Sequence, residues 1–466
     1  MRYNYTLFCV VLGLMLLRLF TLGSYPLFDT TEARYAEIAR LMIETQDWIT
    51  PWFDKGVPFW GKPPAHTWIT AFSFEAFGIS PWSARFAHWC TGALSLIILY
   101  FFAKRSLGVR IAQASILILA SCIGFFIATG MVMTDPALML SSTLAMASFW
   151  LCYKHNNRAA GVIFFFSCGL GMLIKGPVAV VIVGIAIVLW AIWQKRLYSV
   201  IKALPWSLGL PVFVVTFLPW YMLAESKTPG FLNYFLIGEH IQRFLQPGWQ
   251  GDLYGTAHVE PKGTIWLMWL IVACPWSVLF FIRLFKSPDT RAALFSSEIK
   301  TYLITWTIAP LLLFTFASNI LSAYVLPGLP AFALLVSLYF EPFKGYIKIG
   351  LTSFCFYALL IAALIFGWHS KDSEHTTLSA ISESCPNTPV YYLKKLPFSG
   401  RFYSCGWAEL VMDDNELFQL IQTQKTSYVV LTHEQRSTFL WPKNLQCDVL
   451  SENRQRILHR CVRENH

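Results

Sequence analysis

Long stretches of apolar residues, separated by short polar segments, dominate the pattern of this chain. Each stretch is close to the ~20 residues that an α-helix needs to cross the hydrocarbon core of a membrane. The pattern therefore predicts an all-α polytopic membrane protein with about eleven transmembrane helices. The predicted spans cover residues 5–23, 84–103, 111–129, 136–153, 160–174, 177–194, 204–223, 264–283, 301–317, 321–340 and 347–368.

The composition agrees with a membrane protein. The chain has 466 residues, of which 56% are hydrophobic and 13% charged, whereas a soluble domain carries about 25% charged residues. The net charge of +10 could indicate a nucleic-acid partner, but the basic residues lie in short clusters between apolar stretches. Such clusters are typical of cytoplasmic membrane loops, and we expect no nucleic acid to bind.

The distribution of lysine and arginine predicts the orientation. With the N-terminus in the cytoplasm, the basic clusters fall in alternate loops, all on the cytoplasmic side, as the positive-inside rule requires. Because the predicted number of spans is odd, residues 369–466 are then expected in the periplasm. The clusters include Lys104, Arg105 and Arg110; Lys154 and Arg158; Lys195, Arg196 and Lys202; Arg283, Lys286, Arg291 and Lys300; and Lys344 and Lys348.

Residues 369–466 are more polar than the rest and predict a small mixed α/β domain. Residues 389–394 and 427–432 have the pattern of strands, and residues 413–424 that of a helix which begins at Asp413 or Asp414. The transmembrane domain is accordingly expected over residues 1–368.

Four of the eleven cysteines lie in this predicted domain. Small domains in oxidising compartments commonly contain disulfides. We therefore expect at least one disulfide among Cys385, Cys405, Cys447 and Cys461.

The first loop, residues 24–83, is the most highly charged interval between apolar stretches, and Asp29 is its first carboxylate. Residues 30–43 have helical spacing, with Tyr35 and Met42 on one face. Asp29 and Glu32 match a capping box, which is purely structural. Alternatively, a carboxylate at the start of a helix that faces a cleft could act as a general base.

Lys62 lies in the sequence Gly61-Lys62-Pro63-Pro64. The two prolines favour an extended backbone and the glycine permits close approach of other groups. A lysine in this position could extend its ammonium group to the membrane interface. It could equally serve as a point charge for a lipid phosphate.

Other charged residues lie at the predicted outer ends of spans and in the loop 224–263. Asp135 fits an N-cap, and Lys175 a helix boundary, although ionisable groups at membrane depth often mark functional sites. Residues 231–244 predict a short interfacial helix with Glu239, His240 and Arg243 on one face.

Taken together and in this order, five short motifs resemble the bacterial aminoarabinose (4-amino-4-deoxy-L-arabinose) transferases of lipid A. More broadly, they resemble the protein O-mannosyltransferase-like branch of the C-type (GT-C) glycosyltransferases. The resemblance spans residues 20–330. The motifs are Asp29-Thr-Thr-Glu32-Ala-Arg34-Tyr35-Ala-Glu37, Gly61-Lys62-Pro63, Thr134-Asp135-Pro136, Lys175-Gly176 and Glu239-His240-Ile-Gln-Arg243-Phe244.

The resemblance implies a multi-pass enzyme of the bacterial inner membrane with a periplasmic active site. Such an enzyme transfers a sugar from a polyprenyl-phosphate carrier to lipid A or another envelope lipid or glycan. The chain departs from the family at two positions. Family members often have an acidic pair directly before Thr-Arg-Tyr, whereas here the first acid is Asp29, two positions earlier, and Gly61 replaces a glutamate that binds metal in the family.

The resemblance also implies roles for particular residues. Its expected catalytic residues are Asp29, Glu32 and Asp135. The residues expected to bind the donor phosphate or substrate are Lys62, Arg34, Lys175, Arg243 and Tyr324. A divalent metal is left open, with Glu239, His240 and His66 as candidate ligands.

Two other classes of function stay open on the sequence. A phosphotransferase or ligase that acts on lipid-linked sugars would use the same cations but would not need Asp29 as a base. A transporter would place polar residues near the bilayer midplane, whereas the motifs here lie at the ends of spans.

Overall fold

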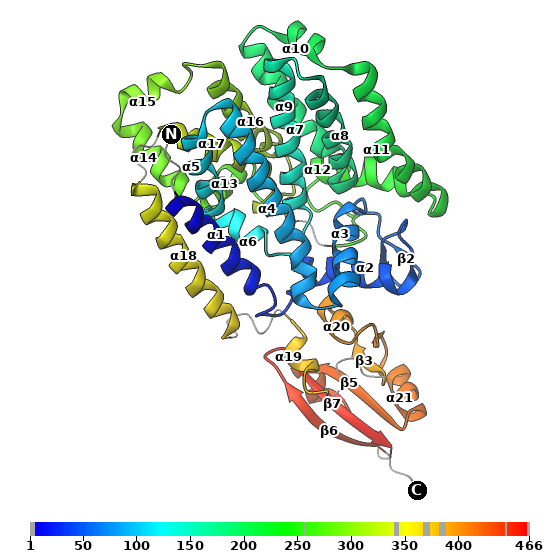
Figure 1. The fold of residues 1–466 in the computed structure, drawn as a ribbon. Helices are drawn as coiled ribbons and strands as arrows, with labels where there is room; N and C mark the ends of the chain where they lie inside the picture. The colour runs from blue at the N-terminus through cyan, green and yellow to red at the C-terminus, as the bar shows by residue number, and fades with distance from the viewer. Residues whose placement is uncertain are drawn as a thin grey trace.

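The structure, a computed structural model, describes residues 5–255, 258–339, 344–366, 373–381, 388–442 and 445–463. It consists of a helical bundle and a smaller five-stranded sheet near the C-terminus (Figure 1). The N-terminus lies at the end of the bundle that carries α10 (Leu197–Ala203) and α15 (Pro288–Ala293), and the sheet lies beyond the opposite end (Figure 1). The predicted domain boundary at 368/369 falls outside the described residues.

Every predicted span coincides with a helix or with two consecutive helices. The prediction of a helical membrane protein is therefore confirmed. The helices are α1 (Tyr5–Phe20), α4 (Pro81–Ser106), α5 (Val109–Ala120) with α6 (Ile123–Ala128), α7 (Asp135–His155), α8 (Arg158–Lys175), α9 (Pro177–Trp193), α11 (Trp206–Lys227), α13 (Thr264–Val272) with α14 (Trp276–Lys286), α16 (Glu298–Thr315), η2 (Ser322–Gly328) with α17 (Leu329–Tyr339), and α18 (Lys344–Ile365).

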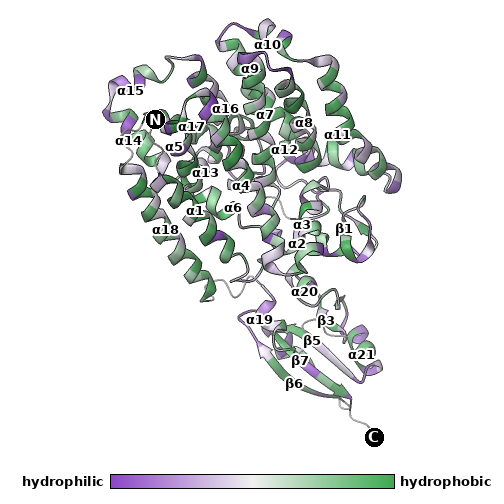
Figure 2. Cartoon of the chain, viewed as in Figure 1, coloured by the Kyte–Doolittle hydropathy of each residue, from purple (hydrophilic) through white to green (hydrophobic). Residues whose placement is uncertain are grey.

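The number of spans stays a prediction. Within the described ranges, six helices are long and apolar enough to cross a membrane, or seven if α13 and α14 form one span. Hydrophobic residues, drawn in green, predominate along the helices of the bundle (Figure 2). In the apolar stretches of α11 and α18, only 22% of the residues are buried within the protein. Most of these side chains therefore face outward, as contact with lipid requires.

Two predicted spans are broken, and their breaks lie side by side. Residues 264–283, predicted as one span, form two helices: α13 and α14 are bent by 103° near Pro275, which has no backbone N–H to continue a helix. The span 111–129 breaks between α5 and α6. There the backbone N–H of Ile123 donates to the carbonyl of Cys274 at 3.0 Å, so the two breaks satisfy each other's free polar groups.

The first loop folds into α2 (Thr31–Thr45), a two-stranded ribbon of β1 (Trp52–Asp54) and β2 (Val57–Pro58), and α3 (Ala65–Phe77). The helix predicted over 30–43 is thus confirmed. Its predicted apolar face, which includes Tyr35, is buried.

The C-terminal sheet is mixed and has the strand order β4-β3-β5-β7-β6. β3 is parallel to β4 and β5, while β7 is antiparallel to β5 and β6. The prediction of a small α/β domain is therefore confirmed. The elements are β3 (Val390–Leu393), α20 (Phe398–Tyr403), β4 (Ala408–Val411), α21 (Asp414–Thr423), β5 (Thr426–Thr432), α22 (His433–Thr438), β6 (Leu445–Glu452) and β7 (Arg456–Arg463), preceded by α19 (His375–Leu378).

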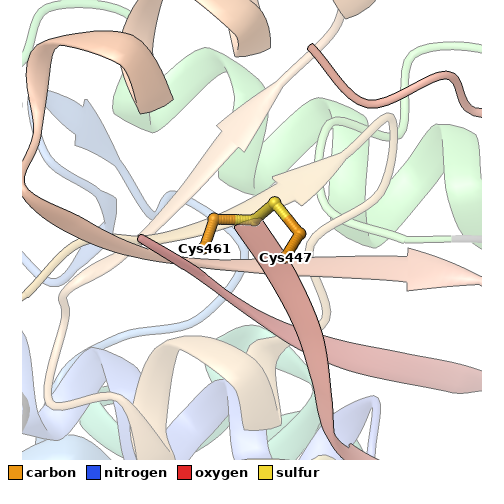
Figure 3. Close-up of a disulfide and its surroundings, with 2 residues drawn as sticks. All are labelled: Cys447 and Cys461. Atoms are coloured by element: carbon orange, nitrogen blue, oxygen red, sulfur yellow. A yellow bond between two sulfur atoms is a disulfide. The ribbon is translucent and has the colours of Figure 1, made fainter. Parts of the chain in front are cut away.

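Within this domain, β3, β5 and α21 match the three predicted elements. The side chain of Asp413 caps α21 by accepting from the backbone N–H groups of Asn415 and Glu416, as expected for an N-cap. A disulfide joins Cys447 on β6 to Cys461 on β7 (Figure 3), and Cys405 is also disulfide-bonded. The prediction of at least one disulfide is confirmed, and Cys385 lies outside the described residues.

The C-terminal domain contacts the first loop through α20. The backbone N–H of Leu27 donates to the Tyr403 hydroxyl at 2.7 Å, and Arg401 forms an ion pair with Asp54. The ring of Phe402 packs 6.2 Å from that of Phe74. The first loop and the C-terminal domain therefore lie at the same end of the bundle.

Candidate active site

Two cavities contain most of the predicted site residues. The first, which we call the lysine pocket, has a volume of about 230 Å³. It lies among η1 (Asn233–Gln242) and the ends of α8, α9 and α16. Its lining residues are Lys62, Lys175, Pro177, Val178, Val181, Glu239, His240, Arg243, Phe244, Leu313, Phe314, Asn319 and Tyr324.

Lys62 lies just before the start of α3, and two oxygen atoms hold its ammonium group. Its Nζ lies 3.0 Å from Oε2 of Glu239 and 2.5 Å from the carbonyl of Gly61. A Cβ atom on Gly61 would lie 2.9 Å from the ring of Phe59 and 3.3 Å from that of Tyr254. Glycine at 61 therefore lets the lysine segment approach these rings closely.

The segment 231–244, predicted as a short interfacial helix, is helical, but most of it is not an α-helix. Residues Asn233–Gln242 form a π-helix, followed by α12 (Arg243–Leu245), and π-helical turns are frequent at functional sites. Nη1 of Arg243 lies 3.0 Å from Oε1 of Glu239. Burial raises the pKa of the Glu239 carboxyl, but Lys62 and Arg243 outweigh it and hold that pKa below its ordinary value.

Lys175 and Asp135 form a buried ion pair with an Nζ–Oδ1 distance of 2.6 Å. The prediction that Asp135 is an N-cap is wrong, because the cap is Thr134 and Asp135 is the first helical residue of α7. The ammonium group of Lys175 lies 4.2 Å from the centroid of the Tyr324 ring, a cation–π contact. Residues far apart in the sequence thus meet in one place.

The lysine pocket combines charge with an apolar wall. Lys62 and Arg243 share Glu239, and Arg243 also lies 3.4 Å from Asp252. The lining also includes aliphatic and aromatic side chains from α9 and α16, among them Val181 and Phe314. The pocket therefore combines cations with apolar side chains, which suits an amphiphilic anion.

Asp29 lies outside the lysine pocket. The N-cap of α2 is Thr30, which makes no side-chain cap bond, so the capping-box interpretation of Asp29 is wrong. The carboxylate instead accepts hydrogen bonds from the backbone N–H of Ser399 at 3.0 Å and from its hydroxyl. Burial raises the pKa of the Asp29 carboxyl, although both bonds from Ser399 lower it.

Glu32 is almost completely buried, with 1% of its surface exposed. Its carboxylate accepts from Nε and Nη2 of Arg85 at 2.7 and 2.8 Å. The backbone N–H groups of Phe28 and Val132 donate to it at 3.1 and 3.3 Å. Glu32 thus accepts four hydrogen bonds from three segments of the chain, which favours a structural role. These bonds fix the start of α2 against α4.

The second cavity, which we call the α1–α18 cavity, has a volume of about 320 Å³. Besides Asp29 and Glu32 it contains the guanidinium of Arg18, which the sequence analysis missed. A single charge within an apolar span was the available signal. The lining residues are Arg18, Tyr25, Phe28, Asp29, Glu32, Phe126, Ile127, Met131, Leu360, Ile361 and Leu364.

Arg34 and His66 do not line either cavity. Nη1 of Arg34 donates to the carbonyl of Tyr254 at 2.5 Å. The buried ring of His66 packs 4.7 Å from the Tyr35 ring, with its Nδ1 3.1 Å from the carbonyl of Pro63. Of the residues predicted to bind the donor phosphate or substrate, Arg34 is therefore the one that lies outside the lysine pocket.

The candidate metal ligands are likewise not brought together. The ring nitrogens of His240 face the carbonyls of Phe235 and Lys175 at 2.7 and 3.2 Å, while Glu239 is bound to Lys62 and Arg243. In the part of the chain that the structure describes, no group of three or more His, Cys, Asp or Glu side chains could hold a metal ion.

Comparisons with known proteins match the chain to one family. The family model of dolichyl-phosphate-mannose-protein mannosyltransferase matches residues 2–235, half of the chain. A curated relative from Yersinia pestis (strain Pestoides F) is 32% identical over 343 residues, which cover 71% of this chain. It is called undecaprenyl phosphate-α-4-amino-4-deoxy-L-arabinose arabinosyl transferase, and a relative from Aeromonas hydrophila subsp. hydrophila with the same name is 32% identical over 325 residues, 68% of this chain.

The alignments cover 58% and 57% of the lengths of these two relatives. Among solved structures, ArnT from Cupriavidus metallidurans bound to undecaprenyl phosphate aligns with a TM-score of 0.78. The alignment covers 97% of both chains at 19% sequence identity. The apo state of that protein aligns with a TM-score of 0.77 at 20% identity, again over 97% of both chains. These two structures share the fold of the whole chain.

Proposed function

Because this chain belongs to the dolichyl-phosphate-mannose-protein mannosyltransferase family, we propose that it is an integral-membrane glycosyltransferase. It transfers a sugar from a polyprenyl-phosphate-linked donor to a lipid or glycan acceptor of the cell envelope. The names of the curated relatives support an undecaprenyl carrier and an aminoarabinose-like sugar, and lipid A is the first acceptor to test.

The lysine pocket is the observation that carries this proposal. A polyprenyl phosphate is an anionic head group on a long apolar chain. The ammonium groups of Lys62 and Lys175 and the guanidinium of Arg243 line one part of the pocket, and Val178, Val181, Leu313 and Phe314 line another. The cations match the phosphate and the apolar wall matches the isoprenoid.

The charge change during transfer explains why the pocket needs cations. The acceptor oxygen forms a bond to the anomeric carbon while the bond from that carbon to the phosphate oxygen breaks. The electron pair leaves with the phosphate, which gains a second negative charge. Lys62 and Arg243 stabilise this charge, and such electrostatic stabilisation is usually a large contribution to catalysis.

The acceptor must lose a proton when its oxygen attacks. Asp29 takes this proton in the proposed mechanism, because its buried carboxylate lines a cavity and both oxygens retain capacity to accept. Attack opposite the leaving phosphate inverts the anomeric carbon. Asp135 keeps Lys175 in place through their ion pair and acts as a positioning residue.

The residues of the lysine pocket do not fit a divalent metal. Gly61 supplies no side-chain ligand, Glu239 is engaged by two cations, and both nitrogens of His240 face carbonyl oxygens. A metal site usually needs at least three protein ligands. We therefore assign no step of the reaction to a metal.

The proposed location is the bacterial inner membrane, with the N-terminus in the cytoplasm and the C-terminal domain in the periplasm. The docking of α20 on the first loop supports a common side for both segments. A phosphatase fused after residue 466 should be active in cells. An inactive phosphatase fusion together with a fluorescent cytoplasmic fusion would reverse the orientation.

The direct test of function is mass spectrometry of lipid A and other envelope glycans from cells with and without the protein. A glycan that loses one sugar in the deletion strain, and regains it on complementation, supports the proposal. A phosphotransferase would move the phosphate together with the sugar. The product mass therefore distinguishes these two activities. A transporter would leave the donor bond intact, so transfer of the sugar by the purified protein rules it out.

A further inference from the structure

Arg18 carries a buried positive charge inside the first apolar helix. Only 4% of its surface is exposed, and its guanidinium lies at the wall of the α1–α18 cavity. Within the described residues it forms no ion pair, and its Nε has no hydrogen-bond partner. Among the described residues, Arg18 is therefore a buried cation with no carboxylate within ion-pair distance.

The groups that do contact this guanidinium are all neutral. Nη1 donates to the Tyr25 hydroxyl at 2.8 Å and Nη2 to the carbonyl of Ile127 at 3.2 Å. The ring of Phe126 lies 5.4 Å from its central carbon. A Cβ atom at Gly130 would come within 1.9 Å of the guanidinium, so glycine at 130 leaves the space in which the arginine lies.

Other buried arginines of the same region differ in this respect. Arg85 contacts both carboxylate oxygens of Glu32, and Arg40 contacts both oxygens of Glu37. A buried ion without a partner costs several kcal/mol of free energy, which a neutral hydrogen bond offsets only in part. Arg18 thus lacks the one group that its neighbours have, an anion.

The cavity next to Arg18 is large enough for that anion, and most of its lining side chains are apolar. Leu360, Ile361 and Leu364 of α18 form one wall. α18 lies at the edge of the bundle beside α1 (Figure 1), and its outward side chains, such as Leu359, are exposed. An anion that enters between these helices therefore comes from the lipid phase and carries an apolar portion.

The cavity is also lined by the carboxylates of Asp29 and Glu32 and by the phenol of Tyr25, and their partners determine which groups could bind there. Glu32 is neutralised by Arg85, and the Tyr25 hydroxyl lies between Arg18 and the carbonyl of Gly130. Asp29 is the proposed base, and it lines this cavity rather than the lysine pocket. A group bound here lies beside the base, as an acceptor must.

We propose that the α1–α18 cavity binds the anionic head group of a membrane amphiphile, paired with Arg18, and that this amphiphile is the acceptor of the transfer. The acceptor role rests on the proposed glycosyltransferase function. The binding itself does not, because it follows from the buried charge and the cavity alone. The lysine pocket and the α1–α18 cavity then hold donor and acceptor separately.

Binding is measured on the full-length protein in phosphatidylcholine nanodiscs. Undecaprenyl phosphate first saturates the lysine pocket, and radiolabelled phosphatidic acid then probes the remaining site. The wild type should bind phosphatidic acid in a saturable manner. Arg18→Gln should weaken this binding at least about tenfold, the effect of losing a charge-assisted hydrogen bond, and Arg18→Lys should retain part of it.

Two further variants keep the inference testable if Arg18→Gln does not fold. Leu364→Trp fills the cavity from the α18 side without touching the guanidinium, and it should also weaken binding. Arg110→Gln makes the same charge change at an exposed position and should leave binding unchanged. Unchanged binding in folded Arg18→Gln, or in Leu364→Trp, overturns the inference.

Inorganic phosphate serves as the comparison for a small soluble anion. If it competes with phosphatidic acid at equal concentration, the cavity is a site for small anions and the amphiphile inference is wrong. Binding of undecaprenyl phosphate in the same samples tests the proposed function separately. Loss of carrier binding in the wild type with retained phosphatidic acid binding would reject the donor assignment alone.

Discussion

The lysine pocket and the α1–α18 cavity both combine cations with apolar walls, but they treat charge differently. In the lysine pocket Lys62 and Arg243 share Glu239, and Lys175 has Asp135. In the α1–α18 cavity Arg18 has only neutral partners among the described residues. The first site is electrostatically complete before a ligand binds, and the second is not.

This difference indicates how each site would exchange its ligand. A phosphate that enters the lysine pocket competes with Glu239, which keeps the cations ordered and returns to them when the phosphate leaves. Such competition favours release of a product that carries an additional charge. An anion beside Arg18 displaces no carboxylate from the guanidinium, whose partners are the Tyr25 hydroxyl and the Ile127 carbonyl, so its pairing stabilises the complex directly. Substitutions in each site should therefore affect different quantities.

The largest expected effect is on turnover, in the α1–α18 cavity. Asp29→Asn keeps the shape of the side chain but removes the group that accepts a proton. Turnover should fall by about 10²–10⁴-fold, as is typical for loss of a general base. The Tm of the purified protein should change little, because the asparagine oxygen still accepts from Ser399. An active Asp29→Asn enzyme would remove Asp29 from the mechanism.

Glu32 lines the same cavity and should affect stability instead. Glu32→Gln leaves the buried Arg85 without its carboxylate, and breaking such a pair costs about 3–5 kcal/mol. We expect a lower Tm in detergent and normal turnover per folded molecule. The control is Glu44→Gln, where a more exposed partner of Arg40 contributes about 0–1 kcal/mol. A stable but inactive Glu32→Gln protein would make Glu32 the base.

Lys62 should affect the donor. Lys62→Ala removes one charged contact to the phosphate, which is worth about 1.5–3 kcal/mol. The KM for the donor should therefore rise about ten- to hundredfold, and Lys62→Arg should recover part of the loss. Lys55→Ala, an exposed lysine in the same loop, is the matched control. A donor KM unchanged in Lys62→Ala would instead support an interfacial role for this lysine.

The smallest expected effect is a shift of the pH profile by Ser399. The bonds from Ser399 lower the pKa of Asp29, so Ser399→Ala should raise that pKa further. The base acts as the carboxylate, and the acid limb of the kcat/KM profile should therefore move to higher pH, with the plateau preserved. Ser437→Ala in the same domain is the control. A plateau that falls without any shift of the limb would indicate damage to domain docking instead.

The sequence predicted the fold well because apolar length and turn residues are local signals. All eleven stretches coincide with helices, and β3, β5 and α21 were recognised. The breaks near Ser121 and Pro275 were missed, because they depend on a contact between two spans that are distant in the sequence. β6 and β7 were missed because their patterns include charged residues such as Asp448 and Arg460, which face away from the core.

The site was predicted in part. Six of the expected residues do meet in the lysine pocket, since charges at the ends of spans converge at one end of a bundle: Lys62, Lys175, Glu239, His240, Arg243 and Tyr324. Asp29 and Ser399 are 370 residues apart in the sequence, so no local pattern could predict their contact. Arg18 did have a local signal, because it is a charged residue within an apolar span. That signal indicates a site only once the structure shows that Arg18 is buried with neutral partners.

The proposed activity of this protein is sugar transfer from a polyprenyl-phosphate donor. Its most direct test incubates the purified protein with undecaprenyl phosphate-4-amino-4-deoxy-L-arabinose, labelled in the sugar, and lipid A in proteoliposomes. The wild type should produce free undecaprenyl phosphate and labelled lipid A in equal amounts. Asp29→Asn should produce neither at a comparable rate. An intact donor, or a product that carries the donor phosphate together with the sugar, would contradict the proposed activity.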